Sequence, residues 1–567
     1  MTIALFAVTA AGRRAAAELA VALPDAELDE LDELAARWPE LDAAVFFLAT
    51  GATVRLVAPL LAGKRTDPGI VCVDEAGRFA VALAGGHGGG ANALARRVAA
   101  VLGAQPVITT ASDAVGATGL DELVGLLGAA VDGDLAAAGT ALLDGVLAVV
   151  NPLGFPLPPL PAATSAAAAP PPPAARHTLV ITDRARPAAP AVTRLVPPTL
   201  VVGIGSARGV PADAVAATLR RIETEHGFDP LAVRAYTSVD LKANEAGILA
   251  AIAPAPLVTY PAAVLAAVDV PHPSEVVRAE VGTPSVAEAA ALHGARELAG
   301  GAPVELVVEK VKGDNVTVAA ARIRPRGRLA IVGLGPGAAD LRVPRAEAEL
   351  RRAAIVVGLD QYVEQVRHLL RPGTEVRATG LGDEEQRAAD AVALAAKGHA
   401  VALIGSGDAG VYAMASPALQ QAGADVEVVG VPGVTAALAA AALLGAPLGH
   451  DHVLISLSDL HTPWDVIQRR VAAAAQADLV ACFYNPRSRD RHWQLGAALD
   501  LLRAHRPAST PVGAVRQAGR PGQRVWTAPI GEFDPAEVDM LTTVIVGSSA
   551  TRMVAGRVVT PRGYRWS

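Results

Sequence analysis

The sequence predicts a multidomain α/β protein, and three observations support this prediction. Strand-like apolar runs alternate with alanine-rich helical stretches along the chain. Several of these runs end directly in glycine-rich turns, which is how parallel strands present backbone groups to a ligand. The chain has 567 residues, too many for one hydrophobic core, so we expect several units of ordinary domain size.

The composition narrows the classes of function. Hydrophobic residues make up 52% of the chain and aromatic residues only 3%, because the apolar content is largely alanine and valine. The most apolar stretch, residues 434–448, is shorter than the ~20 residues of a membrane-spanning helix, and residues 1–8 resemble a strand more than a signal peptide. The net charge of −7 offers no basic surface for nucleic acid. We therefore expect a cytoplasmic protein that acts on small molecules, with no nucleic-acid or membrane partner.

The two cysteines give no sign of a disulfide or of a metal site. Cys72 and Cys482 are far apart in sequence and each lies in an apolar, strand-like run. This pattern favours two buried thiols over a disulfide. No C-x-x-C or H-E-x-x-H spacing occurs, so we expect no protein-bound metal.

Residues 1–120 are expected to form the first α/β domain, with a parallel sheet. A run of glycines around His87 stands directly between an expected strand and a helix expected over residues 93–102. Bare amides at a helix N-terminus favour an anion, which makes His87 a candidate functional residue. A flexible turn with an incidental histidine is the alternative. The expected strands are 3–8, 44–48, 70–73, 79–83 and 106–109.

Residues 121–198 are expected to form a small middle domain. The stretches 152–159 and 161–173 together form a low-complexity segment rich in proline and alanine, with little to bury. We interpret it as a linker or surface excursion within that domain.

Residues 199–325 are expected to form a third domain. A strand over 200–204 closes on glycines, and residues 306–310 with 315–320 are typical of a hairpin. Asp240, Lys242 and Glu245 lie close together where a strand passes into a helix. Their spacing fits a catalytic constellation and equally a capping box with a solvated helix face.

Residues 326–567 are expected to form the last domain, and they carry the clearest motifs. Apolar runs end in glycine-containing turns at residues 333–337, 405–410 and 430–435, and further strands are expected over 453–458 and 479–484. Several such strand ends around one crevice describe a cofactor site built mostly from backbone groups. Within the second turn, Asp408 could serve only to form the turn.

The turn at 333–337 also admits a competing interpretation. Gly333, Gly335 and Ala338 fit the dinucleotide pattern G-x-G-x-x-A, and Asp360 lies where a ribose-binding acid is expected. Pro336 removes one of the amides that a phosphate needs, and the next helix is expected to begin only near residue 344. A dinucleotide-binding oxidoreductase is therefore the less favoured alternative.

Three motifs in order give the last domain a family resemblance. G-x-G-P-G at 333–337, S-G-D at 406–408 and V-P-G-V-T-A-A at 431–437 resemble the tetrapyrrole methylases, and residues 445–451 and 484–488 resemble in particular the precorrin-3B C(17)-methyltransferases. The resemblance implies S-adenosylmethionine in a cleft between two α/β subdomains. The motif positions imply, as its contacts, Pro336, Ser406, Gly407, Asp408, Val411, Thr435, Ala436, Tyr484, Ala518, Thr542 and Thr543.

The same resemblance implies a tetrapyrrole substrate and a homodimer. Methyl transfer from a sulfonium needs no metal, because holding the methyl in line with a ring carbon supplies much of the rate. Two motifs depart from the family pattern: in G-D-P-G-x-Y-G, Ala409 replaces the proline and Ala413 the last glycine, and after G-x-G-P-G, Ala338 replaces an acid. The second departure places in doubt any acid catalysis from that position.

The first 325 residues resemble cobalt-precorrin-5A hydrolase. The resemblance rests on residues 85–92, 106–113, 238–247 and 282–289. It implies opening of a lactone with release of a two-carbon aldehyde. The lactone arises in the ring contraction that accompanies C(17) methylation, so a fusion of the two activities is chemically coherent.

The candidate catalytic residues of the hydrolase half are His87, Asp240, Lys242 and Glu245. A base would activate water, and Lys242 would stabilise an oxyanion. This chain has Ser206-Ala207 where the hydrolase family usually has Cys-Arg. A front half that only holds substrate is therefore a second interpretation.

Overall fold

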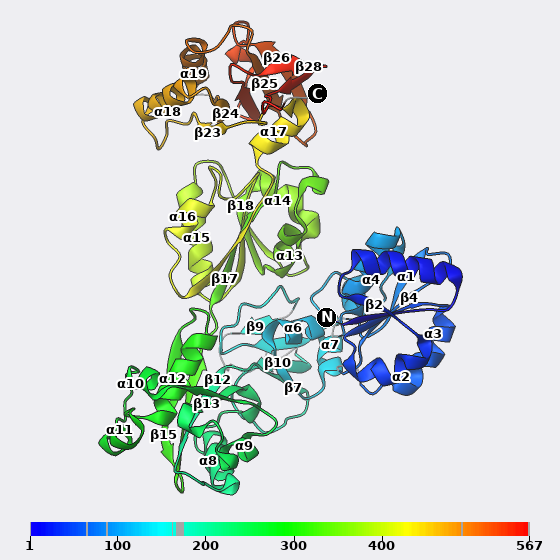
Figure 1. The fold of residues 1–567 in the computed structure, drawn as a ribbon, viewed down its shortest axis with the longest axis vertical. Coiled ribbons are helices and arrows are strands. Elements are labelled where there is room, and N and C mark those ends of the chain that lie inside the picture. The colour runs from blue at the N-terminus through cyan, green and yellow to red at the C-terminus, as the bar shows by residue number, and fades with distance from the viewer. Residues whose placement is uncertain are drawn as a thin grey trace. The chain divides into compact units, whose positions relative to one another are not determined.

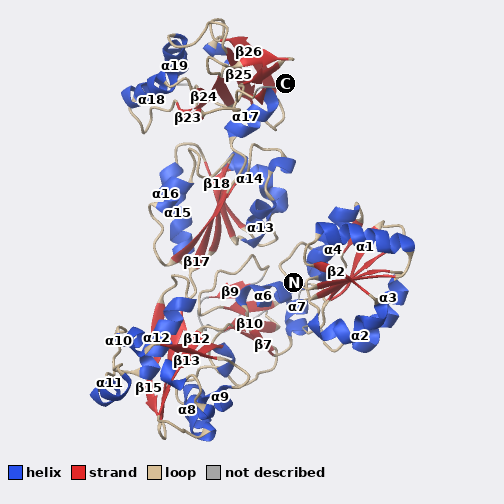
Figure 2. Cartoon of the chain, in the orientation of Figure 1, coloured by secondary structure: helices blue, strands red, loops and turns tan. Residues whose placement is uncertain are grey.

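The computed structural model describes residues 2–63, 66–86, 89–161, 163–165, 175–488 and 491–564 (Figure 1). It divides into two compact units, Met1–Arg326 with Arg371–Gly373, and Gly327–Leu370 with Thr374–Ser567. In both units β-sheets are flanked by helices (Figure 2). The multidomain α/β fold expected from the sequence is therefore confirmed.

The first sheet has six strands in the order β2-β1-β3-β4-β5-β6. Its core strands are wholly buried, because helices cover both faces. The expected parallel arrangement is wrong at one place: β4 and β5 pair antiparallel, since residues 74–78 are too short for a crossover. The elements are β1 (Ile3–Ala7), α1 (Ala10–Ala22), β2 (Ala26–Asp29), α2 (Leu34–Arg37), β3 (Ala43–Phe47), α3 (Thr50–Val57), β4 (Gly69–Val73), β5 (Phe79–Ala84), α4 (Ala91–Leu102), β6 (Gln105–Val107) and α5 (Ala111–Ala114).

The second sheet has the order β7-β11-β10-β8-β9, and only the β7 edge is antiparallel. Its helices bury leucine and alanine side chains against the strands. Of the segment expected to be a linker, residues 162 and 166–173 lie outside the described residues, but residues 152–159 are described and Leu157 packs into the core of this sheet, so the expectation of little to bury is wrong there. The elements are α6 (Leu120–Leu127), β7 (Ala130–Asp132), α7 (Leu135–Leu143), β8 (Leu147–Val150), β9 (Ala163–Ser165), β10 (His177–Ile181) and β11 (Val192–Val196).

The third sheet has the order β14-β13-β12-β16-β15. Three parallel strands continue into an antiparallel hairpin, which confirms the hairpin expected from the sequence. Helices α8 and α9 cover one face, and α10 and α12 cover the other. The elements are β12 (Leu200–Ser206), α8 (Ala212–Thr224), β13 (Val233–Val239), α9 (Ala246–Ile252), β14 (Leu257–Tyr260), α10 (Ala262–Ala266), α11 (Glu275–Val281), α12 (Val286–Leu298), β15 (Val304–Lys312) and β16 (Val316–Ile323).

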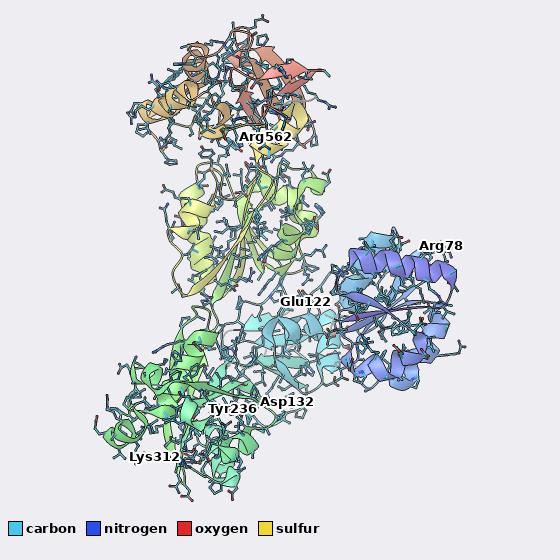
Figure 3. The ribbon with its side chains drawn as sticks, in the orientation of Figure 1. Arg78, Glu122, Asp132, Tyr236, Lys312 and Arg562 are labelled. Atoms are coloured by element: carbon cyan, nitrogen blue, oxygen red, sulfur yellow. The ribbon has the colours of Figure 1, made fainter. Side chains whose placement is uncertain are left out.

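Buried ion pairs join the second and third sheets. Asp183, which follows β10 and is fully buried, accepts a hydrogen bond of 3.0 Å from Arg322 on β16. Arg194 on β11 donates to Asp229, before β13, at 2.9 Å and also pairs with Asp132, which Figure 3 labels. Because each buried charge has its partner in the neighbouring sheet or strand, the pairs are compensated rather than costly.

The fourth sheet is entirely parallel, in the order β19-β18-β20-β17-β21. Its central strands are continuous apolar runs, as expected for strands buried on both faces. The elements are β17 (Gly327–Gly333), α13 (Pro344–Arg352), β18 (Ile355–Leu359), α14 (Asp360–Val366), β19 (Glu375–Thr379), α15 (Glu384–Ala396), β20 (Ala400–Gly405), α16 (Ala415–Leu419) and β21 (Val426–Val431).

The fifth sheet has the order β23-β24-β27-β25-β26, and the chain enters it through α17 directly after β21. A small sheet of β22, β29 and β28 lies beside α17. The elements are α17 (Ala436–Leu444), β22 (Gly445–Ala446), β23 (His452–Ser456), α18 (Trp464–Gln476), β24 (Val480–Tyr484), α19 (Gln494–Arg503), β25 (Pro511–Arg516), β26 (Arg524–Pro529), β27 (Thr542–Val546), β28 (Arg552–Val554) and β29 (Arg557–Val559).

Both cysteines are free and buried, which confirms the expectation of two buried thiols. Cys72 on β4 donates to the Leu48 carbonyl at 2.9 Å, and burial raises the pKa of Cys482 on β24 to about 12. Within the described ranges, no helix is both long and apolar enough to cross a membrane.

Candidate functional site

Three glycine turns at the carboxyl ends of β17, β20 and β21 meet in the second unit. Gly335 and Gly407 exchange backbone hydrogen bonds of 3.1 and 2.8 Å, as two strands do. A Cβ at Gly433 would lie 2.0 Å from the Gly407 carbonyl oxygen, and one at Gly333 would lie 2.7 Å from the same oxygen. Only glycine therefore fits where the three turns touch, which is why the motifs contain it.

Asp408 ties two of these turns together. Its Oδ1 accepts from the Gly410 N–H at 2.8 Å, and its Oδ2 accepts from the Gly433 N–H at 3.0 Å. The alternative that Asp408 forms the turn is thus confirmed, and its implied contact with the cofactor stays a prediction.

A cavity of about 160 Å³ opens beside the turns, between the fourth and fifth sheets. Eight of the eleven residues implied as cofactor contacts line it, and Asp408, Val411 and Thr435 lie outside its lining. The lining consists of Pro336, Tyr362, Ser406, Gly407, Ala436, Tyr484, Asn485, Val515, Gln517, Ala518, Arg520, Met540, Leu541, Thr542 and Thr543.

Tyr484 anchors the start of α17 at this cavity. Its hydroxyl accepts from the Ala437 N–H at 3.0 Å and shares a short hydrogen bond with the Thr435 hydroxyl. Thr435 thus reaches the cavity only through Tyr484. Burial raises the pKa of Tyr484 despite these hydrogen bonds, so the phenol stays neutral and acts as a hydrogen-bonding group.

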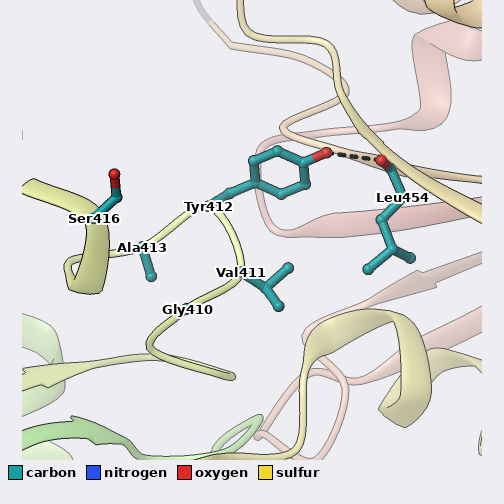
Figure 4. A pocket seen from close by; sticks show the side chains of 6 residues that line it. All are labelled: Gly410, Val411, Tyr412, Ala413, Ser416 and Leu454. Carbon is teal, nitrogen blue, oxygen red and sulfur yellow. Dashed lines mark hydrogen bonds between the residues drawn. The ribbon is translucent and has the colours of Figure 1, made fainter. Parts of the chain in front are cut away.

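A second cavity, of about 390 Å³, lies next to the S-G-D turn (Figure 4). Val411 lines it, together with Gly410, Ala413 and Ser416. The Tyr412 hydroxyl donates to the Leu454 carbonyl at 2.7 Å, so one tyrosine links the loop after β20 to β23. The Tyr412 and Tyr484 ring centroids are 5.3 Å apart, which brings the two cavities close together.

In the first unit, the structure brings Lys242 and Glu245 together. The Lys242 ammonium lies 3.0 Å from Glu245 Oε2, and Glu245 Oε1 accepts from the Gly209 N–H at 2.8 Å. Burial alone would raise the pKa of Glu245, but the hydrogen bonds from Lys242 and Gly209 outweigh it and lower the pKa. Glu245 makes no cap hydrogen bond to α9, so the capping-box alternative is wrong.

Asp240 lies apart from this pair. It is exposed, and its Oδ1 accepts from the Leu241 N–H at 2.8 Å. The predicted constellation is therefore reduced to two residues. Ser206, at the carboxyl end of β12, has a buried hydroxyl with no hydrogen-bond partner among the described residues.

His87 lies outside the described residues. Beside the glycine-rich turn, Asn92 on α4 is buried and donates to the Thr110 hydroxyl and to Asp113, both at 2.9 Å. Arg96 pairs with the other oxygen of Asp113 at 2.7 Å. Hydrogen-bonded polar side chains therefore lie next to the glycine-rich turn, on the side of α4.

Glu288 on α12 is fully buried, and the sequence alone predicted no role for it. It accepts from Lys310 N at 3.1 Å and from the Ser285 hydroxyl at 3.2 Å, and it lies 2.8 Å from His272 Nδ1. These contacts fix α12 to β15, so this part of the motif at 282–289 is structural.

Comparison with known proteins assigns both units to known families. The family model for tetrapyrrole (corrin/porphyrin) methylases matches residues 328–534. The models for the N-terminal and C-terminal parts of cobalamin synthesis G match residues 32–113 and 200–321. A probable cobalt-factor III C(17)-methyltransferase of Salmonella typhimurium is 48% identical over 242 residues, which is 42% of this chain and 99% of that protein.

The chain belongs to the tetrapyrrole methylase family. A precorrin-3B C(17)-methyltransferase of Sinorhizobium is 44% identical over 249 residues, 42% of this chain and 97% of that protein. Among solved structures, the methyltransferase CobJ is 38% identical, with a TM-score of 0.40, over 41% of this chain and all of that one. This tetrapyrrole methylase carries cobalamin synthesis G domains in front of its methylase domain, which confirms the fusion inferred from the motifs.

Several residues of the methylase cavity were missed by sequence reasoning. Tyr362 lies on α14, and Gln517 and Arg520 lie in the loop after β25, all outside the glycine motifs, so nothing in their local spacing marks them. Arg520 contacts two residues of the glycine motifs directly: its Nε donates to the Pro336 carbonyl at 2.5 Å, and its Nη2 donates to the Ser406 hydroxyl at 2.6 Å.

Proposed function

We propose that this tetrapyrrole methylase is a bifunctional enzyme of corrin synthesis. Its second unit methylates C(17) of precorrin-3B, or of the cobalt form, with ring contraction. Its first unit opens the lactone of cobalt-precorrin-5A with release of acetaldehyde. The observation that carries the proposal is the glycine-built cavity beside residues 333–337, in a chain whose first unit holds the Lys242–Glu245 pair.

The cavity fits S-adenosylmethionine, which supplies an electrophilic methyl group on a sulfonium. The glycine turns pack closely because they carry no Cβ, and this packing places the backbone of Gly407 at the cavity wall. Thr542 and Thr543 are nearly buried at the opposite wall, suited to hold an adenosine. These groups hold and orient the donor, and positioning supplies much of the rate.

The tetrapyrrole acceptor is best accommodated at the larger cavity beside Val411 and Tyr412. It is open, and it adjoins the donor cavity at the two tyrosines. The neutral Tyr484 hydroxyl can then hydrogen-bond a substrate without competing for the methyl group.

For lactone opening, the Lys242 ammonium stabilises the oxyanion that forms when water adds to the carbonyl. Glu245 holds Lys242 in place through their ion pair, and the lowered pKa of Glu245 makes it a weak base. Activation of water therefore falls to another group, and His87 is the candidate from the sequence. Ser206 offers a hydroxyl that has no hydrogen-bond partner in the described part of the chain, at the position where the hydrolase family usually has cysteine.

The test uses the full chain with S-adenosylmethionine and cobalt-precorrin-3, followed by product mass and an acetaldehyde assay. We expect a product that carries one added methyl group, and acetaldehyde once cobalt-precorrin-5A is supplied. Tight binding of NAD without binding of S-adenosylhomocysteine would contradict the methyl-transfer proposal.

Lys242→Met should abolish acetaldehyde release and leave methyl transfer unchanged, whereas Lys312→Met on exposed β15 should change neither. The second candidate function, a substrate-holding front half, is favoured by Ser206-Ala207. Wild-type protein that methylates but releases no acetaldehyde would support that candidate.

A further inference from the structure

Arg520 lies in the loop between β25 and β26 and extends into the donor cavity. Its Nε donates to the Pro336 carbonyl at 2.5 Å, and its Nη2 donates to the Ser406 hydroxyl at 2.6 Å. The guanidinium carbon is 6.0 Å from the centre of the Tyr362 ring. Pro336, Ser406 and Tyr362, which lie in turns and a helix beside the fourth sheet, thus surround the Arg520 guanidinium, which comes from the fifth sheet.

Gly337, the last glycine of the G-x-G-P-G motif, makes room for this side chain. A Cβ at Gly337 would lie 2.5 Å from Arg520 Cγ and 2.6 Å from Arg520 Nε. Gly337 also has a φ of +135°, which other residues rarely adopt. The motif therefore admits the arginine as well as shaping the turn.

The charge of Arg520 has no carboxylate partner within the part of the chain that the structure describes. Its partners there are a carbonyl and a hydroxyl. The neighbouring arginines of the same hairpin are paired, Arg516 with Asp539 and Arg524 with Glu537, each at 2.6 Å. A half-buried guanidinium with only neutral partners favours an anion, and its planar fork matches a carboxylate.

The hydrogen bonds that Arg520 makes leave one edge of the guanidinium open. Nε and one hydrogen of Nη2 are engaged, whereas Nη1 makes no hydrogen bond among the described residues. The Nη1–Nη2 edge can therefore hold both oxygens of a carboxylate.

We propose that Arg520 binds a carboxylate of one of the two methyl-transfer substrates and so determines the affinity of the protein for that substrate. The inference rests on the proposed function of the second unit. Two carboxylates have the required chemistry: the amino-acid end of S-adenosylmethionine, and an acidic side chain of the tetrapyrrole. The two arms of the test separate them.

The donor arm measures binding to the full chain by calorimetry. S-adenosylhomocysteine carries the amino-acid carboxylate, whereas 5′-methylthioadenosine keeps the adenosine and thioether without it. If Arg520 holds the donor, Arg520→Gln weakens S-adenosylhomocysteine binding roughly 10-fold to 100-fold and leaves 5′-methylthioadenosine unchanged. Arg520→Lys should lose less, because it keeps the charge without the fork.

The acceptor arm measures the KM for cobalt-precorrin-3 in the methyl-transfer assay. If Arg520 holds the tetrapyrrole, Arg520→Gln raises this KM roughly 10-fold or more, while S-adenosylhomocysteine binding stays within twofold. Arg524→Gln removes a paired arginine from the same hairpin and should change neither arm.

The inference is overturned if Arg520→Gln leaves both arms within twofold of wild type. It is also overturned if the variant weakens 5′-methylthioadenosine as much as S-adenosylhomocysteine, since that marks a collapsed cavity. Wild-type protein that binds no S-adenosylhomocysteine would instead refute the proposed function itself, so the two failures are distinguishable.

Discussion

The two candidate sites differ in what forms them: one is formed by the backbone and the other by charged side chains. Around Gly407 the methylase site is made of main chain, and atoms beyond the backbone do not fit where the turns touch. The site at Lys242 and Glu245 is made of side-chain charge held by one backbone amide. The first should therefore fail when an atom is added, and the second when a charge is removed.

The largest expected effect tests the main-chain site. Gly433→Ala forces a Cβ to within 2.0 Å of the Gly407 carbonyl oxygen, so the turns must separate. We expect S-adenosylhomocysteine affinity to fall more than ~100-fold and stability to fall by about 1–3 kcal/mol. Calorimetric titration and thermal unfolding measure both effects.

The control is Gly430→Ala, three residues earlier in the same segment, where a Cβ would meet nothing within 4 Å. It should bind like wild type. Equal affinity in the two variants would mean that the contact between the turns does not shape the site.

A smaller effect is expected at the junction of the turns with α17. Tyr484→Phe leaves the Ala437 N–H without its acceptor and removes the bond with Thr435. We expect a loss of about 1 kcal/mol in the free energy of unfolding and several-fold weaker S-adenosylhomocysteine binding.

Tyr412→Phe provides the comparison, because its hydroxyl donates to Leu454 beside the other cavity. It should leave S-adenosylhomocysteine binding near wild type. A larger loss from Tyr412→Phe than from Tyr484→Phe would reverse our assignment of the two cavities.

The side-chain site should show its charge as a pH dependence. The pKa of Glu245 is lowered in the folded protein, so the pair stabilises fully above the unfolded pKa of about 4.3. That contribution is lost as the pH falls through the lower folded pKa. Glu245→Gln should therefore cost up to about 1 kcal/mol near neutral pH, and its difference from wild type should vanish in acid.

Thermal unfolding of both proteins between pH 7 and pH 3 measures this difference. Glu223→Gln is the control, since Glu223 is exposed on α8 of the same domain and makes no salt bridge among the described residues. A gap between Glu245→Gln and wild type that widens towards acid would contradict the assigned pKa direction.

The smallest expected effect is that the buried Cys482 thiol does not react with an alkylating reagent. Cys482 lies two residues before Tyr484, is fully buried, and has a pKa raised to about 12. Because the thiolate is the reactive form, iodoacetamide at pH 8 should leave Cys482 unmodified in the native protein and modify it after denaturation. Rapid labelling of the native protein, detected by peptide mass, would show that the core beneath the cavity opens.

The fold was predictable from the sequence where the local pattern decides it. Apolar runs closed by glycine gave β12, β17 and β20 within a residue or two, and Pro344 begins α13 as expected. The antiparallel pair of β4 and β5 was not predicted. The general alternation of strands and helices favoured a parallel pair, whereas the short turn between these two strands requires an antiparallel one. The division into domains stays a prediction, apart from the observed separation after Arg326.

The site was predictable where the motif itself touches the cavity. Ser406 and Gly407 directly follow β20 of the parallel fourth sheet, and Tyr484 ends β24 of the mixed fifth sheet, so each lies at the carboxyl end of a strand. Arg520 could not be found, since its contact with Pro336 joins residues distant in sequence. Asp240 was chosen for its nearness in sequence, but a 3-10 turn directs it to solvent and away from Glu245.

The buried ion pairs between the second and third sheets limit how the first unit can be subdivided for expression. A fragment that begins at residue 199 would keep Arg322 and Asp229 but lose Asp183 and Arg194. Arg322 would keep Glu305 at 3.2 Å, but Asp229 would lose its arginine, and an orphaned buried charge costs roughly 3–5 kcal/mol, a large part of the stability of a small domain. The shortest piece that can carry the Lys242 site in folded form therefore begins before β7, and a gene for the first unit alone should end after Arg326.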